Sequence, residues 1–169
     1  YMETSSQTTI TNGNTAASDS TAYNGAVYVY TRDNTSSWSQ QAYIKASNAQ
    51  QTSAFFTYFG FSISLENNTL AVGSAGDGSS QTTITNGTTS SSDNSKPASG
   101  AVFVYTRSGT NWSQQAYIKA SNSDQDDSFG YSVSLDKNTL AVGAHQESSR
   151  QNTITNGSSS SSENYVNPS

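Results

Sequence analysis

The sequence predicts an all-β chain, and three observations support this. Residues 25–74 and 100–144 are two copies of one repeat, which is a signature of fold before it is one of function. The apolar residues of both copies alternate as they do in strands, and no segment has a helical period. Turn-forming residues, mainly Asn, Gly, Ser and Asp, follow each short apolar segment. We expect each repeat to supply four antiparallel strands.

The first strand of the repeat is predicted at 25–32, GAVYVYTR. Val27 and Val29 lie on one face, and Tyr28 and Tyr30 lie on the other. Since both faces are apolar, this strand is expected to be packed on two sides, as in a sheet that lies between other sheets.

The second strand is predicted at 38–47, WSQQAYIKAS, after the turn signal DNTSS. Ala42 and Ile44 alternate with Tyr43 and Lys45. Compared with the first strand, this strand is expected to have the more solvated face.

The third and fourth strands are predicted at 59–65, FGFSISL, and 69–74, TLAVGS, joined by a short turn; the second copy repeats them at 129–135 and 139–144. In the third strand, large side chains lie on one face and Gly or Ser on the other. Successive sheets can therefore nest, bulk into hollow. The segment between the second and third strands is four residues longer in the first repeat, which predicts a loop there.

Polar inserts at 1–24, 75–99 and 145–169 flank the repeats, and each contains the letters TITNG. Asn-Gly favours the type I′ turn, so each insert is expected to form a small polar hairpin. A solvated loop is the simpler interpretation of these inserts, and a recognition surface is the alternative.

Composition narrows the class of protein. The 169 residues are only 31% hydrophobic, but the formal net charge of −5 is too small for the usual disordered chain. There is no cysteine, so neither disulfides nor thiolate metal sites can hold the fold. The few basic residues are scattered, which argues against a nucleic-acid partner, and no apolar stretch is long enough to span a membrane.

The Phe-Gly pairs at 59–60 and 129–130, with the Ala-Val-Gly ends at 71–73 and 141–143, resemble the FG-GAP repeat of integrin α-subunit propellers and bacterial surface proteins. The resemblance implies β-propeller blades of four strands and an extracellular or cell-surface location. About two blades are expected in this chain. Because propellers typically use four to eight, further sequence or other chains must complete them.

Calcium-binding members of this family carry an Asp-rich loop between two blade strands. The corresponding turns here, 66–68 and 136–138, are too short to supply six to eight oxygen ligands. Asp124, Asp126 and Asp127 form the densest acidic cluster, and either a solvated turn or weak cation binding fits them. The first repeat has no acid at the matching positions, so we favour the solvated turn.

No catalytic, cofactor or metal residue is predicted. His145, with Glu147 nearby, lacks a nucleophile or metal-ligand partner and is expected to be a solvated loop residue. The recurring aromatic residues are expected to pack between sheets rather than to stack on sugars: Trp38, Trp112, Tyr43 and Tyr117. The recurring basic residues are expected to be strand-edge charges that discourage wrong pairing: Lys45, Lys119, Arg32 and Arg107. Glycosylation sequons are attributed to chance in so Asn- and Ser-rich a chain: Asn34, Asn67, Asn86, Asn111 and Asn156.

These patterns favour a non-catalytic extracellular β-propeller-type module that presents Ser/Thr/Asn-rich loops for adhesion or scaffolding, with a protein or glycan ligand that the sequence does not identify. The alternative is a structural subunit that assembles head to tail into a ring or fibre. A third possibility is part of a larger enzyme whose site lies outside this chain.

Overall fold

The computed structural model describes residues 4–5, 7–18, 23–49, 56–158 and 160–161, and this part of the chain is all-β. Its strands are β1 (Ile10–Asn12), β2 (Val27–Arg32), β3 (Trp38–Ile44), β4 (Phe59–Glu66), β5 (Thr69–Ser74), β6 (Ile84–Asn86), β7 (Ala101–Ser108), β8 (Asn111–Ile118), β9 (Phe129–Asp136) and β10 (Thr139–Ala144). The predicted four strands of each repeat are present. Residues 50–55 of the predicted long loop lie outside the described part.

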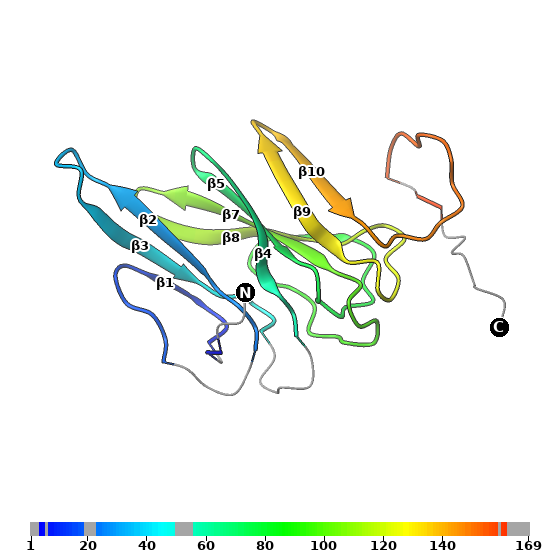
Figure 1. Cartoon of the computed structure of the whole chain (residues 1–169), viewed down its shortest axis with the longest axis horizontal. Coiled ribbons are helices and arrows are strands. Elements are labelled where there is room, and N and C mark those ends of the chain that lie inside the picture. The colour runs from blue at the N-terminus through cyan, green and yellow to red at the C-terminus, as the bar shows by residue number, and fades with distance from the viewer. Residues whose placement is uncertain (1–3, 6, 19–22, 50–55, 159, 162–169) are drawn as a thin grey trace.

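The strands form three antiparallel units that do not close on themselves (Figure 1). We call them the first sheet, in the order β1-β3-β2, the central sheet, β4-β5-β7-β8-β6, and the last hairpin, β9-β10. In Figure 1 they follow one another from one end of the molecule to the other. This open arrangement is that of partial propeller blades.

The sheets are out of phase with the sequence repeats, which differs from the expectation of one sheet per repeat. The central sheet joins the last two strands of the first repeat to the first two of the second, across the insert 75–99. Val72 of β5 lies opposite Phe103 of β7, and Leu70 lies opposite Tyr105. This pairing places large apolar side chains together on one face.

The inner strands of the central sheet, β5 and β7, are packed on both faces, and β7 is the second copy of the strand at 25–32 for which the sequence predicts such packing. On one face, Phe103 and Tyr105 pack with Val27 and Val29 of the first sheet. The other face packs against the last hairpin. In β2 the prediction holds on one face alone, because Tyr28 and Tyr30 are 42% and 52% exposed.

The last hairpin nests on the central sheet in the predicted manner, with bulk set into a hollow. Val133 and Leu135 of β9 pack against the small side chains of the central sheet. A Cβ atom on Gly73 would lie 2.0 Å from the carbonyl oxygen of Gly130. The two backbones can approach this closely because neither position carries a side chain.

The predicted polar hairpins in the inserts are wrong. Instead, β1 and β6 each add one short strand to the outer edge of a sheet, so that Ile10 pairs with Ile44 and Ile84 with Ile118. Positive φ occurs at the glycine, 111° at Gly13, and not at the preceding asparagine, whereas a type I′ turn needs both. An open strand edge nearby offers more hydrogen bonds than a two-residue turn does.

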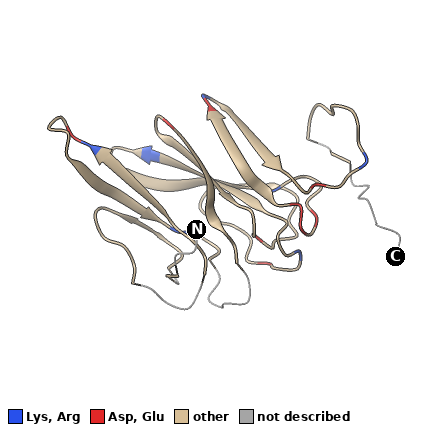
Figure 2. Cartoon of the chain, viewed as in Figure 1, with Lys and Arg blue, Asp and Glu red and all other residues tan. Residues whose placement is uncertain are grey.

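Charged side chains gather at hairpin ends and in loops (Figure 2). No helix among the described residues could cross a membrane.

Candidate functional site

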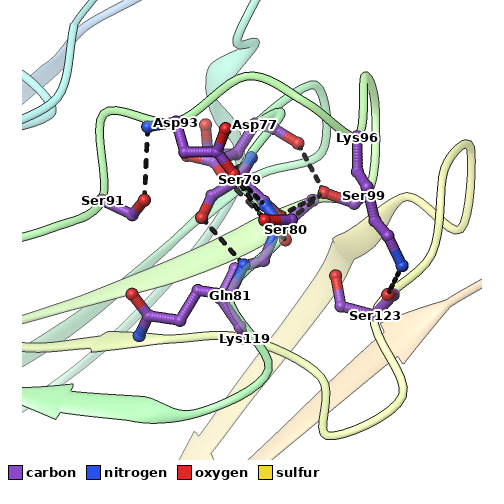
Figure 3. A network of polar contacts seen from close by, with 12 residues as sticks. Asp77, Ser79, Ser80, Gln81, Ser91, Asp93, Lys96, Ser99, Lys119 and Ser123 are labelled. Carbon is purple, nitrogen blue, oxygen red and sulfur yellow. Dashed lines mark hydrogen bonds and ion pairs between the residues drawn. The ribbon is translucent and has the colours of Figure 1, made fainter.

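A buried polar cluster joins the insert 75–99 to the second strand of the next repeat (Figure 3). The Lys119 ammonium lies 3.3 Å from the Asp77 carboxylate, with the two side chains 0% and 1% exposed. Lys119 also donates hydrogen bonds to the Ser99 hydroxyl and the Gly100 carbonyl oxygen. Tyr117 donates its hydroxyl hydrogen to Asp77 over 2.8 Å. We call these residues the lysine joint.

The electrostatics of the lysine joint follow from burial. Burial lowers the pKa of Lys119, and the nearby Asp77 charge opposes that shift. Burial, with the Asp77 charge as a second cause, raises the pKa of Tyr117. The Asp77 carboxylate has its acceptor positions filled by Lys119, Tyr117, Asn48 and the Ser79 amide. The cluster therefore ties the insert 75–99 to the end of β8 and, through Asn48, to the residues that follow β3 of the first sheet.

The prediction that Lys45 and Lys119 are strand-edge charges is wrong, since they are 1% and 4% exposed. Tyr43, on the same face of the first sheet as Lys45, is buried too, whereas Trp38 at the start of β3 is 68% exposed. A spacing in the sequence could have shown this: Lys119 follows Asp77 by the same 42 residues that separate Lys45 from Glu3. Glu3 lies outside the described residues.

Glu147 occupies the position of Asp77 in the next insert. Asn122 donates to Glu147 over 2.8 Å, as Asn48 donates to Asp77 over 2.7 Å. Glu147 is partly exposed, whereas Asp77 is buried, and within the described residues no lysine forms an ion pair with it. In the sequence Glu147 stands out only as a neighbour of His145, and its equivalence to Asp77 becomes visible when the inserts are aligned at a spacing of 70 residues.

His145 is exposed, as predicted, and its ring lies 3.9 Å from that of Tyr131.

The three aspartates near residue 125 do not converge on one point. Asp124 pairs with Lys96 at 3.1 Å, and Asp126 is exposed. Asp127 is buried, so the prediction of a solvated turn is wrong for this residue, and burial raises its pKa. Its carboxylate accepts a hydrogen bond from the Asp124 amide and fixes the loop. In the described part of the chain, no cluster of three or more His, Cys, Asp or Glu could hold a metal ion.

Packing between sheets, as predicted, explains two of the four recurring aromatic residues. Tyr117 and Trp112 belong to the buried cluster between the central sheet and the first sheet, and Trp112 donates its indole hydrogen to Gln41 of the first sheet. Tyr43 is buried as well, but it lies against Tyr28 on the opposite face of the first sheet. Trp38 is instead 68% exposed. It lies on the face of the first sheet that is turned away from the central sheet, and no sheet formed by the described residues covers it.

The recurring arginines, predicted to be strand-edge charges, also stack on the recurring tryptophans. Arg107 lies over the Trp112 ring at 5.5 Å, and Arg32 lies over Trp38 at 5.8 Å. Arg107 also donates hydrogen bonds to Asn68 and Gln41, which come from two other strands or turns. This residue therefore ties the ends of neighbouring sheets together.

The inserts share one internal bond pattern, in which a glutamine amide spans the Thr-Ile-Thr segment. Gln81 donates to the Thr83 carbonyl oxygen and the Thr85 hydroxyl, and Gln7 and Gln151 make the same two bonds in their inserts. Gln114 then holds the turn by donating to carbonyl oxygens of Gly87 and Thr89. The inserts are thus built elements, although their sequences are polar and repetitive.

Residues 112–166 match the family model of the FG-GAP repeat. No curated protein and no solved structure matches the chain. The match includes the Phe-Gly pair at 129–130 and the Ala-Val-Gly end at 141–143, and it confirms the resemblance there. The open, all-β arrangement is consistent with partial β-propeller blades.

Proposed function

We propose that this chain, with an FG-GAP repeat at 112–166, is a non-catalytic extracellular or cell-surface module whose polar inserts bind a protein or glycan for adhesion or scaffolding. FG-GAP repeats are typical of extracellular and surface proteins, which supports the location. A propeller-type scaffold is rigid, and ligands commonly bind to the loops that such a scaffold holds in place.

The observation that carries this proposal is the repeated glutamine bond pattern of the inserts. It gives successive inserts the same local shape, one sheet apart along the molecule. Thr82, Thr83 and Thr88 in the middle insert are exposed and offer hydroxyl groups at fixed positions. Such a row can bind a repetitive ligand at several points, which raises avidity without a strong single contact.

Binding of the full chain to arrays of glycans and matrix proteins tests this function. We expect binding that is lost when the three insert glutamines, Gln7, Gln81 and Gln151, are replaced by Ala. The Gln115→Ala variant is the control, because Gln115 is exposed on a strand of the central sheet. No binding to either array, or equal binding by the triple variant, would refute the proposal.

A second candidate function is head-to-tail self-assembly. It is favoured by the first sheet and the last hairpin, since each has an edge strand with no neighbouring strand in the described structure. Exposed strand edges of this kind are templates for pairing with another chain.

A further inference from the structure

Two nearly identical strands have different surroundings in this molecule. β5, TLAVGS, lies inside the central sheet, where Leu70, Ala71 and Val72 are 1%, 0% and 0% exposed. β10, TLAVGA, is at an edge, where Ala141 is exposed and Val142 is partly exposed. The difference is the strand β7, which pairs with β5 and has no counterpart beside β10 in the described residues.

The counterpart of β7 exists elsewhere in the same chain. β2 has nearly the sequence of β7, and it is an edge strand of the first sheet. Tyr30 is 52% exposed there, whereas the equivalent Tyr105 is 1% exposed. Trp38 of β3 is 68% exposed, whereas the equivalent Trp112 is 3% exposed.

A third exposed surface belongs to β4. Ile63 and Leu65 are 50% and 56% exposed. Their equivalents in β9, Val133 and Leu135, are partly buried because they pack on the central sheet. Side chains of this size are usually covered when they share one face of a sheet.

We propose that β10 of one copy of this chain pairs with β2 of a second copy, in the antiparallel register that β5 and β7 already use. That register pairs Leu70 with Tyr105 and Ala71 with Val104. By repeat equivalence, Leu140 lies opposite Tyr30 and Ala141 lies opposite Val29 of the second copy. The inference rests on the second candidate function, head-to-tail assembly, and adds the partner strands and their register.

The second copy is the fitting occupant because one contact covers all three exposed surfaces. The last hairpin of one copy and β2-β3 of the other form a four-stranded sheet like β4-β5-β7-β8. Tyr30 and Trp38 then face the central sheet of the first copy. Ile63 and Leu65 of the second copy pack on the new sheet, as Val133 and Leu135 pack on the central one.

A cleft of about 850 Å³ lies beside the last hairpin and is lined in part by Phe129, Val142 and Ala144. The equivalent residues Phe59, Val72 and Ser74 are 0%, 0% and 1% exposed in the first repeat. In the proposed contact, strands β2 and β3 of the second copy would cover Phe129, Val142 and Ala144. The described residues of each copy form one complete blade and two half blades, and the contact completes a blade from a half of each copy.

Cysteine cross-linking of the full chain tests the register, because the native sequence has no cysteine. The variant with Ala141→Cys and Val29→Cys is expected to form a covalent dimer or larger species under mild oxidation. The control combines Ala141→Cys with Thr31→Cys, which lies on the same face but two residues out of register. At that offset the Cα atoms are too far apart for a disulfide. β2 and β10 lie at opposite ends of the molecule, so a link within one chain does not compete (Figure 1).

Light scattering of the cysteine-free chain across a concentration series separates the two proposals. Growth in mass, with cross-linking in the predicted pair and not in the control, supports both. Growth in mass with no cross-link, or with equal cross-linking in the control, overturns the register and leaves head-to-tail assembly standing. A chain that stays monomeric and unlinked overturns both, and assigns these edges to another partner.

A charge variant gives an independent measurement. Tyr30→Lys places an ammonium on a side chain that is exposed in one copy and buried in the proposed contact, so the mass should fall to that of the monomer. Ser108→Lys, at the exposed end of β7, adds the same charge away from both edges and should assemble like the native chain. Equal assembly of the two variants would overturn the proposed contact.

Discussion

Removing the charge of Asp77 should destabilise the protein strongly. In Asp77→Asn the Lys119 ammonium, whose side chain is 0% exposed, keeps its hydrogen bonds to Ser99 and Gly100 but loses its counter-charge. Breaking a buried ion pair by removing one partner typically costs about 3–5 kcal/mol in the free energy of unfolding. Since small proteins have about 5–15 kcal/mol in total, the loss is a large fraction of the stability.

Urea unfolding, followed by circular dichroism and tryptophan fluorescence, measures this loss. Glu147→Gln is the matched control, because Glu147 has the equivalent asparagine and serine contacts. As Glu147 is partly exposed and has no ion pair within the described residues, we expect it to lose about 1 kcal/mol or less. The two variants therefore differ mainly in the buried ion pair.

A double-mutant cycle separates the ion pair from the other contacts. Lys119→Met removes the ammonium, and its combination with Asp77→Asn should cost less than the sum of the single variants, because no uncompensated charge stays buried. If Asp77→Asn loses no more stability than Glu147→Gln, or if the two changes add without coupling, the account of the lysine joint is refuted.

Three further comparisons of variants probe the packing and the pH dependence. Gly73→Ala should lower the free energy of unfolding by about 1–3 kcal/mol, because its Cβ would lie 2.0 Å from the Gly130 carbonyl oxygen. Gly143→Ala should lower it less in the same urea assay, because the closest contact of its Cβ is a serine hydroxyl. Equal losses would contradict the nested packing. Trp112→Ala should lower the free energy of unfolding by about 3–5 kcal/mol, and Trp38→Ala should lower it far less, because the two tryptophans are 3% and 68% exposed. Similar losses in thermal or urea unfolding would argue against the assigned sheet contacts. Burial raises the pKa of Asp127, so the native state binds a proton at this carboxylate more readily than the unfolded chain does. The protonated carboxyl group therefore contributes stability below the unfolded pKa of about 3.9, and this contribution is lost as pH rises through the folded pKa. Asp127→Asn should therefore be most stable relative to the native chain near neutral pH, and unfolding curves that show no such pH-dependent difference would count against a buried carboxylate.

The strands and the nested packing could be predicted from the sequence because they depend on local alternation. β7 is apolar on both faces, and it is packed on both. The third strand of the repeat has large and small faces, and β9 lies with its large face against the central sheet. These patterns are visible within eight or fewer residues.

The phase of the sheets could not be predicted in the same way. The strand at 69–74 pairs on one side with the third strand of its own repeat. The sequence does not show which strand pairs with its other side, because the next strand along the chain follows a polar insert of 25 residues. The Asn-Gly prediction failed for a related reason. The Thr-Ile-Thr segment pairs with the free edge of β3 or β8 instead of folding back on itself. These strands lie about 30 residues further along the chain, so the local sequence does not reveal the pairing.

The lysine joint was missed because lysine is almost never fully buried unless it is paired. Lys119 therefore appeared as an edge charge until its partner was known. Asp77 lies in a polar insert that looks like an ordinary solvated loop. The equal spacing of acid and lysine in both repeats was the available signal, and it requires the repeats to be aligned across their inserts.

Amide hydrogen exchange of the dilute, monomeric chain tests the open-edged arrangement of sheets most directly. The amides of β5 and β10 have almost the same sequence, so intrinsic exchange rates differ little between them. We predict protection along the whole of 69–74, which has a strand on both sides, and rapid exchange at alternate positions of 139–144, which has a strand on one side. Equal protection of the two segments in the monomer would contradict the arrangement.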